Sequence, residues 1–341
     1  MAGKRTTIKD VAAKAGVGIS IVSYVLNNTP GKTVSAATRQ RIFDAVEELQ
    51  YTPNAIARGM RIKKTMTIGL VSYWNVNDLV FIEILEGVSR IADENGYNIL
   101  YCSLKSDKHA FSYKELFRRQ QIDGIILVSP PEHNTDYNEM EHIDAIKKDK
   151  IPAVIINGCT KDDSLSYIYF DYYQTAYKAA EYLIGLGHRK IGYLLPCEKD
   201  MRHVQAQERV RGFKDALRDH GIEIANGFIY HPEDVECLCD RIMKGEGPTG
   251  LVTNKSDYGY IFLKHANNRG IRVPEQISVI AANTESYANY LFPALTTIHL
   301  PMKEIGRKAA EVLMDIMDGR MSQVKLKLPN RVEERESCGR I

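Results

Sequence analysis

Short runs of β-branched and other apolar residues alternate with helical segments through most of this chain, and this alternation restricts the fold more than any other feature. We expect strands at residues 68–73, 99–103, 124–128, 153–156, 168–170, 191–195, 250–253, 277–281 and 296–299, and helices at residues 83–94, 172–186, 204–220 and 257–268. Such alternation predicts an α/β fold with doubly wound parallel sheets. Because 341 residues are too many for one ordinary core, we expect two sheets, with a ligand cleft between two lobes at the carboxyl ends of their strands.

The composition is that of a soluble globular protein, with 44% hydrophobic and 26% charged residues. No stretch approaches the roughly 18 consecutive apolar residues of a membrane-spanning helix, and the N-terminal segment lacks the apolar run of a signal peptide. We therefore expect a cytoplasmic protein with no membrane partner. The six cysteines are scattered without a Cys-x-x-Cys pair, so we expect reduced thiols, no metal site and no cofactor.

Residues 7–27 predict two short helices joined at a glycine. The segment 10–15 is rich in alanine, a good helix former, and Gly16 can supply the left-handed backbone that ends a helix. Apolar side chains then recur at helical spacing, at Ile19, Val22, Val25 and Leu26. Two helices that cross at such a turn form a helix-turn-helix, whose second helix enters a DNA major groove.

A third helix completes this head. Ser35 is placed to cap it, and the apolar residues that would close a three-helix core are Val34, Ile42, Val46 and Leu49. Residues 1–64 have a net charge of +7, whereas residues 65–341 have a net charge of −5. A short basic head can arise by chance, but its coincidence with the helix-turn-helix pattern indicates a segment that meets DNA phosphates.

Residues 51–61 predict a short helix that begins at Pro53. The segment is too short to be stable alone, and Gly59 lowers its helix propensity by roughly 1 kcal/mol relative to alanine. We expect this hinge to be frayed unless a partner orders it.

Several motifs, in order along the chain, resemble the LacI/GalR family of bacterial transcription repressors. They are Thr7-Ile8-Lys9-Asp10-Val11-Ala12 in the head, Tyr51-Thr52-Pro53-Asn54-Ala55-Ile56-Ala57-Arg58 in the hinge, and Gly187-His188-Arg189-Lys190-Ile191, Arg209-Val210-Arg211-Gly212-Phe213, Arg272-Val273-Pro274-Glu275 and Arg335-Glu336-Ser337-Cys338 in the body. The resemblance implies a homodimer that binds double-stranded DNA at a pseudopalindromic operator and a small effector in the cleft of a body like a periplasmic sugar-binding protein. The absence of a leucine-rich heptad tail favours a dimer over a tetramer.

The resemblance also implies domain boundaries. The head would be residues 1–50, the hinge helix and linker residues 51–64, and the body residues 65–341. The N-lobe would comprise about residues 65–165 and 298–325, and the C-lobe about residues 166–297 and 326–341, with chain crossings near residues 165, 297 and 325.

The DNA-contacting positions implied by the resemblance are Thr7, Ile8, Lys9, Gly18, Ile19, Ser20, Ser23, Tyr24, Asn27, Ser35, Asn54, Ala57, Arg58 and Met60. Ile19, Ser20 and Tyr24 would read bases in the major groove. Ala57 and Met60 would lie in the minor groove, with Met60 in place of the family's usual leucine wedge. Gly18 stands where relatives usually carry a serine that contacts a phosphate.

The effector-binding positions implied by the resemblance are Tyr73, Trp74, Asn157, Arg209, Asn254, Lys255 and Asn283. Sugar-binding relatives carry aspartate at the positions of Asn157, Lys255 and Asn283. The changes make the cleft more positive, so an anionic effector, such as a sugar phosphate or sugar acid, suits it at least as well as a neutral sugar. Three alternatives stay open: Arg209 could pair on the surface with Glu208 or a neighbour, Trp74 could pack within its loop, and Lys255 could be a solvated charge.

An enzyme is the competing function class, because doubly wound sheets also support catalysis. The chain has no GxGxxG after its first strand, no GxxxxGK[ST], no GxSxG and no HExxH, and His188 is expected to pack or cap at its turn. We therefore expect no catalytic residues. A binding protein without DNA contacts would not need the basic head, so we expect a ligand-responsive repressor. The effector could be an inducer, which releases DNA, or a corepressor.

Overall fold

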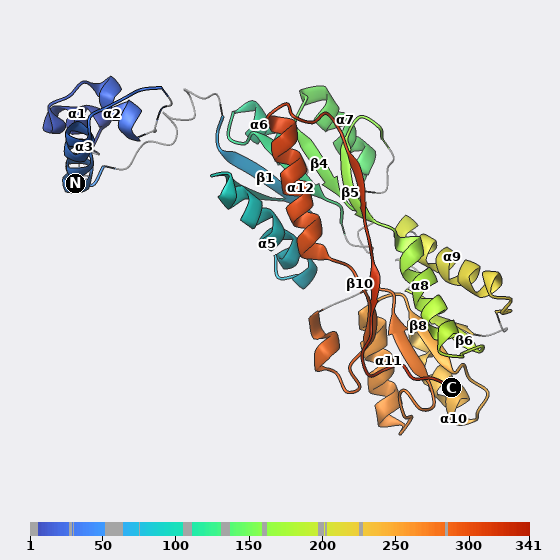
Figure 1. Ribbon diagram of the computed structural model, residues 1–341. Coiled ribbons are helices and arrows are strands. Elements are labelled where there is room, and N and C mark those ends of the chain that lie inside the picture. Colours follow the sequence, from blue (N-terminus) through green and yellow to red (C-terminus); the bar gives the residue numbers. More distant parts are fainter. Residues whose placement is uncertain are drawn as a thin grey trace. The chain divides into compact units, whose positions relative to one another are not determined.

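The computed structural model describes residues 6–26, 29, 31–51, 64–74, 76–104, 111–130, 137–158, 162–196, 201, 203–224, 228–283 and 286–341. It divides into two units, residues 1–65 and 66–341. Figure 1 labels the helices and strands of both units. The hinge predicted at residues 51–61 lies almost entirely outside the described residues.

The first unit is a head of three helices, α1 (Ile8–Ala15), α2 (Ile19–Leu26) and α3 (Ala36–Glu48). Gly16 adopts the predicted left-handed conformation, with φ of 65°, and ends α1. The Ser35 hydroxyl accepts a hydrogen bond from the Thr38 amide and caps α3, as predicted. The buried core of the head consists of Val11, Ala12, Ala15, Val22, Val25, Ile42 and Ala45.

The second unit contains two six-stranded sheets. The first has the order β11-β5-β4-β3-β1-β2 and is wholly parallel. Its strands are β1 (Thr67–Ser72), β2 (Asn98–Ser103), β3 (Gly124–Val128), β4 (Ala153–Ile156), β5 (Ser166–Phe170) and β11 (Lys325–Leu328). Helices α5 (Leu79–Glu94) and α12 (Met302–Met317) share one core, and α6 (Ser112–Arg118) and α7 (Glu139–Asp149) share the other. We call these elements the first lobe.

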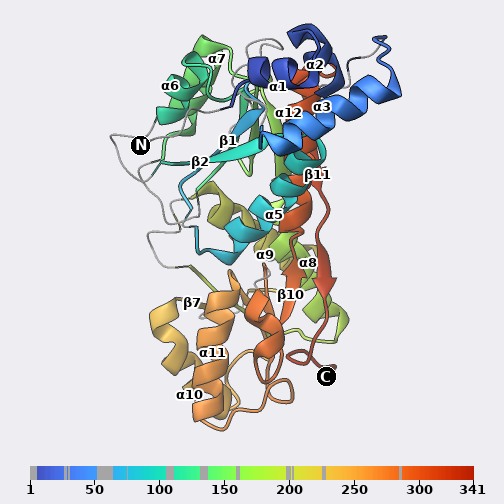
Figure 2. The same cartoon turned by 90° about the vertical axis from the view of Figure 1, so that its left-hand side faces the viewer.

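The second sheet has the order β12-β10-β9-β8-β6-β7, and only β12 is antiparallel to its neighbour. Its strands are β6 (Ile191–Leu194), β7 (Ile229–Tyr230), β8 (Gly250–Thr253), β9 (Ser278–Ala281), β10 (Thr296–His299) and β12 (Arg331–Glu333). Helices α8 (Tyr172–Gly185) and α9 (Val204–Asp219) share one core, and α10 (Val235–Met243) and α11 (Ser256–Asn268) share the other. Both views place α10 and α11 side by side (Figures 1 and 2). These elements form the second lobe.

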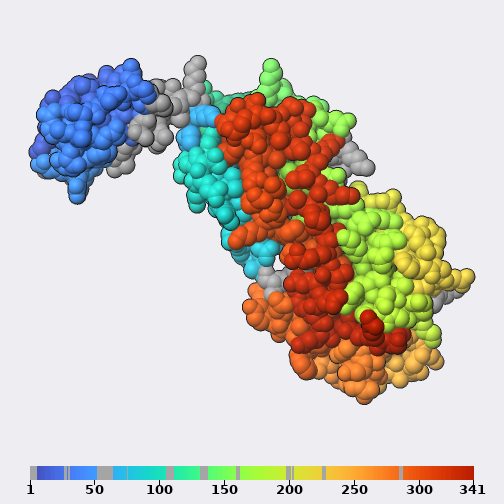
Figure 3. Space-filling model, viewed as in Figure 1, coloured from blue at the N-terminus to red at the C-terminus, as the bar shows by residue number. Residues whose placement is uncertain are grey.

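The chain passes between the lobes later than the sequence predicted. Because β5 pairs with β4 and β11, residues 166–170 belong to the first lobe rather than the second. The crossings therefore follow β5, β10 and β11, a few residues beyond the predicted positions near 165, 297 and 325. The C-terminal segment from α12 onward runs along one face of both lobes (Figures 1 and 3). Local sequence could not place the crossings, because β5 finds its second partner in this distant segment.

Two glycines bring α5 and α12 into backbone contact. A Cβ atom on Gly87 would lie 2.0 Å from the Lys303 carbonyl oxygen, and one on Gly306 would lie 2.2 Å from the Ile84 carbonyl oxygen. In the second lobe, a Cβ on Gly212 of α9 would lie 2.1 Å from the Tyr173 carbonyl oxygen of α8. These helix pairs thus meet where only hydrogen can stand in place of a side chain. No helix in the described part of the chain is long and apolar enough to cross a membrane.

Candidate DNA-binding surface and effector cavity

The start of α2 presents the exposed surface expected of a recognition helix. Gly18, Ile19 and Ser20 are exposed, and Ile19 is 44% accessible although its side chain is large and apolar. Val22 and Val25, on the opposite face, are buried in the head core. Tyr24 is half-buried, and the Lys32 ammonium lies 5.6 Å from the centre of its ring, which adds a cation beside this surface.

Other predicted DNA contacts have structural partners within the head. The Thr7 amide donates to the Asp10 carboxylate at 2.8 Å, and the Thr7 hydroxyl lies 2.7 Å from the same oxygen. The Ser35 hydroxyl caps α3, and Ile8 packs against the head core. Lys9 is exposed and Ser23 is half-buried. The predicted positions Asn27, Asn54, Ala57, Arg58 and Met60 lie outside the described residues.

A cavity of about 260 Å³ lies between the two lobes. Its lining residues follow the carboxyl ends of strands, as expected for doubly wound sheets: Trp74 follows β1, Ser129 follows β3, Asn157 follows β4, Lys255 follows β8 and Asn283 follows β9. Five of the seven predicted effector positions line it, namely Trp74, Asn157, Arg209, Lys255 and Asn283.

Arg209 is the deeply placed cation of this cavity. It lies on α9 with only 3% of its surface exposed, and its guanidinium stacks 4.8 Å from the centre of the Tyr172 ring, which also lines the cavity. Glu208 instead pairs with Arg211 at 2.5 Å. The alternative of a surface ion pair between Arg209 and Glu208 is therefore wrong.

Asn157 and Asn283 have committed their side-chain oxygens to the protein. Asn157 Oδ1 accepts from the Phe170 amide at 3.3 Å, and Asn283 Oδ1 accepts from the Ser256 amide at 2.7 Å. An amide whose oxygen is engaged has its NH₂ group left for other partners. Both asparagines thus contribute donors to the cavity wall.

Asn157 also connects the lobes. Its backbone has a φ of 56°, a conformation that asparagine tolerates better than most residues, and its carbonyl oxygen accepts from Gln205 of α9 at 3.4 Å. Gln205 lines the same cavity. The cavity is therefore bridged by a hydrogen bond that joins β4 of the first lobe to α9 of the second.

Trp74 both packs in its loop and lines the cavity. Its indole N–H donates to the Ser129 carbonyl oxygen at 2.7 Å, and its ring packs against the core shared by α5 and α12. Tyr73 does not line the cavity, contrary to the prediction. Its side chain lies on the opposite side of the sheet, where its hydroxyl is 3.3 Å from His142 Nε2.

His142 is the centre of this separate aromatic cluster. It is buried, its Nδ1 is 3.0 Å from the Tyr113 hydroxyl, and the ring of Tyr137 stacks on it. Burial lowers the pKa of His142 to about 4. Its imidazole is therefore neutral at pH 7.

Asn254 was also predicted to bind effector, but it is fully buried and is absent from the cavity lining. Its Oδ1 accepts from the Tyr193 hydroxyl at 2.8 Å. Asn254 thus supports β6 and β8 beneath the cavity rather than facing a ligand. His188 packs at its turn as expected, with its ring nitrogens 3.0 Å from the Thr249 and Ser278 hydroxyls.

Among the described lining residues of the cavity the formal charges balance, which the three family positions Asn157, Lys255 and Asn283 alone did not predict. Asp78 and Asp257 also line it and balance Arg209 and Lys255. Asp78 caps α5 by accepting from the Val80 amide at 3.0 Å, and Asp257 lies in the first turn of α11. The capping pattern before the apolar helix at residues 79–94 could have identified Asp78. Among the described residues, no three His, Cys, Asp or Glu side chains are grouped so as to hold a metal ion.

Comparisons with known proteins agree with this two-part architecture. Residues 7–54 match the family model "Bacterial regulatory proteins, lacI family", and residues 180–338 match the model "Periplasmic binding protein-like domain". The HTH-type transcriptional repressor PurR of Vibrio vulnificus is 32% identical over 319 residues, which cover 91% of each chain. This chain belongs to the LacI family. It combines a DNA-binding domain with an effector-binding domain, as transcriptional repressors of this family do.

Two further relatives extend the comparison. Catabolite control protein A of Priestia megaterium is 28% identical over 341 residues, covering 97% of this chain and 98% of that protein. The lac repressor dimer bound to operator and the anti-inducer ONPF has the same fold, with a TM-score of 0.79 at 21% identity over 98% of this chain and 100% of the lac repressor chain.

Proposed function

We propose that this LacI-family protein is a cytoplasmic homodimeric repressor, that α2 reads its operator, and that a small effector with several oxygen acceptors controls it from the cavity between the lobes. The observation that carries the effector class is the donor-rich lining. Arg209 and Lys255 are cations, and the side-chain oxygens of Asn157 and Asn283 accept from the protein, so that their NH₂ groups can donate to a ligand. A sugar or a sugar phosphate presents the matching acceptors.

Because the charges that line the cavity balance, both a neutral sugar and a sugar phosphate remain candidate effectors. A neutral sugar would accept hydrogen bonds through its hydroxyl oxygens from the donors of the lining, and its apolar face would stack on Trp74. A solved structure with the same fold, the transcriptional regulator CelR, is a complex with the sugar cellobiose. A sugar phosphate would place its phosphoryl oxygens on Arg209 and Lys255. The role of α2 in reading the operator is supported by three exposed positions at its start, Gly18, Ile19 and Ser20. None of them packs in the described core of the head.

The decisive experiment uses Trp74, which is the only tryptophan in the chain. Its emission should change when a ligand enters the cavity. Sugars, sugar phosphates and nucleobases are screened by this signal and by thermal shift, and each hit is added to a complex of the protein with an operator selected from random DNA. A panel in which hits alter Trp74 emission but never operator affinity contradicts effector control.

A single substitution distinguishes a neutral sugar from a sugar phosphate as the effector. Lys255→Asp should keep or improve binding of a neutral sugar, because it restores the carboxylate that sugar-binding relatives carry. The same change should abolish the response to the matched sugar phosphate, because it places like charges together. Titrating wild-type and variant proteins with both ligands measures each outcome.

An exposed aromatic patch supports the homodimer. Tyr287, Tyr290 and Phe292, within and just after the short helix at Ser286–Tyr290, form this patch, and Tyr290 and Phe292 are 83% and 91% exposed. Exposed aromatic side chains this close together in the chain are a common feature of protein interfaces. We assign a second copy of this chain as the occupant, because a repressor with one head per chain needs two copies to read both halves of a pseudopalindrome.

Sedimentation velocity tests the patch. Phe292→Asp should shift the dimer toward monomer and weaken operator binding. Met243→Asp, at an equally apolar but separate exposed position on α10, is the matched control and should remain dimeric. A fully dimeric Phe292→Asp protein would place the interface elsewhere.

A further inference from the structure

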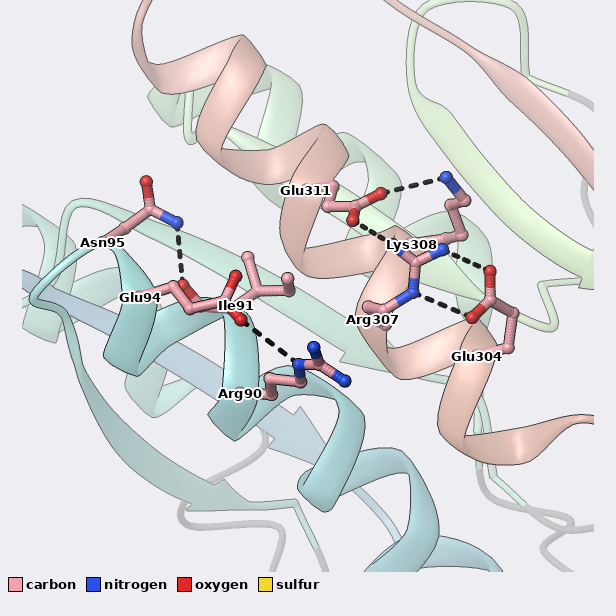
Figure 4. A network of polar contacts seen from close by, with 8 residues as sticks. All are labelled: Arg90, Ile91, Glu94, Asn95, Glu304, Arg307, Lys308 and Glu311. Atoms are coloured by element: carbon pink, nitrogen blue, oxygen red, sulfur yellow. Dashed lines mark hydrogen bonds and ion pairs between the residues drawn. The ribbon is translucent and has the colours of Figure 1, made fainter.

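A second cavity of about 330 Å³ lies where α5, α12 and the segment after β10 meet. Its charged or titratable lining residues are Glu83, Arg90, His299, Lys303, Glu304 and Arg307. Figure 4 shows Arg90 on α5 and Arg307 on the neighbouring α12. None of these six residues lines the effector cavity, so this is a separate site.

The glycine contact between the helices explains why this space is open. Gly87 lines the cavity, and its lack of a side chain lets α5 touch the backbone of α12 at Lys303. Gly87 therefore adds no side chain to the cavity, and the longer side chains of both helices line it. The cavity is a consequence of how the first lobe packs rather than of a loose surface loop.

Two of the three cations are available to a ligand at little cost. Arg90 pairs with Glu94 at 3.1 Å, and Lys303 pairs with Glu86, and all four side chains are more than half exposed. Exposed pairs of this kind contribute about 0–1 kcal/mol. An anion that enters the cavity can therefore replace Glu94 and Glu86 as partners.

Arg307 provides a fixed cation beside them. Its guanidinium is held by Glu304 at 2.5 Å and by Glu311, and these carboxylates raise its pKa. Figure 4 shows both carboxylates around Arg307. Within the described lining, Arg90, Lys303 and Arg307 face two carboxylates, those of Glu83 and Glu304, whereas Glu86, Glu94 and Glu311 pair with the same cations from outside the lining.

The lining connects this cavity to the effector cavity. Met302 lines both, and it is almost fully buried between them. His299 ends β10 of the second lobe, whereas Arg90 and Arg307 lie on helices of the first. A ligand that contacts all three therefore binds one arrangement of the lobes better than others, which is the condition for coupling between two sites.

We propose that this cavity binds a small anion with two phosphate or carboxylate groups, and that its occupancy is coupled through Met302 to the effector cavity. A ligand with two anionic groups could place one group on the cation of α5 and the other on the cations of α12. Arginine binds both phosphate and carboxylate groups. Only the coupling rests on the proposed function, because the binding can be measured without operator or effector.

The test is a calorimetric titration of the full chain with pyrophosphate, at constant ionic strength set with chloride. Wild-type protein should bind it, and Arg90→Gln/Lys303→Gln should bind it at least tenfold more weakly. Arg218→Gln, which removes an equally exposed, paired arginine from α9, is the matched control and should bind like wild type. Either single variant, Arg90→Gln or Lys303→Gln, replaces the double variant if circular dichroism shows that the latter is unfolded.

Trp74 emission distinguishes the two cavities. Coupling predicts that pyrophosphate changes the emission of wild-type protein and not that of the double variant. If wild-type protein does not bind pyrophosphate, or if affinity and emission change survive in the double variant, the anion site is refuted. If wild-type protein binds it while Trp74 emission stays constant, the coupling is refuted and the site alone stands.

Discussion

Replacing Gly87 with alanine should destabilise the first lobe, although alanine is the better helix former. The new Cβ would lie 2.0 Å from the Lys303 carbonyl oxygen and 2.7 Å from the Arg307 amide nitrogen, whereas real Cβ atoms essentially never approach within 3.0 Å. The helices must therefore separate by about 1 Å, and the atoms in the way belong to backbone that cannot rotate aside. We assign a steric cost of roughly 3 kcal/mol, the upper end for overpacking.

Helix propensity offsets part of this cost. Alanine is about 1 kcal/mol more favourable than glycine inside a helix, so the net loss is about 2 kcal/mol, or about 4–8 °C in Tm. Thermal and urea unfolding followed by Trp74 emission measure it, because Trp74 packs against the core that α5 and α12 share.

Gly185→Ala is the matched control. A Cβ at this position of α8 would meet nothing within 4 Å, so the same chemical change should stabilise the protein by about 0.5–1 kcal/mol. If Gly87→Ala proves as stable as wild type, the close backbone contact between α5 and α12 is not present as described.

Three further predictions concern the cavity, the buried histidine and the recognition helix. Arg209→Ala should still dimerise and bind operator but lose its response to cavity ligands, and a response of wild-type size in a gel-shift titration would contradict the cavity assignment. Because burial lowers the folded-state pKa of His142 from 6.5 to about 4, protons bind the unfolded chain first. The free energy of unfolding should accordingly be unaffected by this group above pH 6.5 and fall by about 3 kcal/mol toward pH 4, and His142→Gln should show a shallower loss over this window in urea titrations. Substituting Ser20 should shift base preference at one position of each half-site by about 1–3 kcal/mol in a selection from random operators, whereas an unchanged consensus would mean that Ser20 contacts only the DNA backbone.

Nine strands of the two lobes were predictable, and eight of them are short, largely buried runs, β2 being the exposed exception. All nine expected runs are strands, and the four expected body helices are present. Seven elements were not predicted: α6, α7, α10, α12, β7, β11 and β12. The apolar positions of α12, including Ile305, Ala309 and Leu313, have helical spacing, so the sequence pattern does indicate this helix. β11 was not visible in the same way, because Lys-Leu-Lys-Leu is a strand only through its pairing with distant β5.

The candidate site was predictable in its position but not in its detail. Tyr73 and Trp74 are consecutive, and consecutive side chains at the end of a strand point to opposite faces, so only one of them could line the cavity. The sequence does not say which face of β1 meets the second lobe. Asp78 and Asp257 were missed for a related reason, since each lies at a helix N-terminus that reaches the cavity only when the sheets are assembled.

The position of α12 in the chain has a consequence for biosynthesis. α12 covers the core face of the first lobe, yet roughly 130 residues, including almost all of the second lobe, separate it from the end of β5. At about 5–20 residues per second, a nascent first lobe waits roughly 7–26 s for its covering helix. Through this interval α5 alone covers this face of the sheet, and the part that α12 will cover is open to solvent and to chaperones, so folding of the first lobe is completed only after most of the second lobe has left the ribosome.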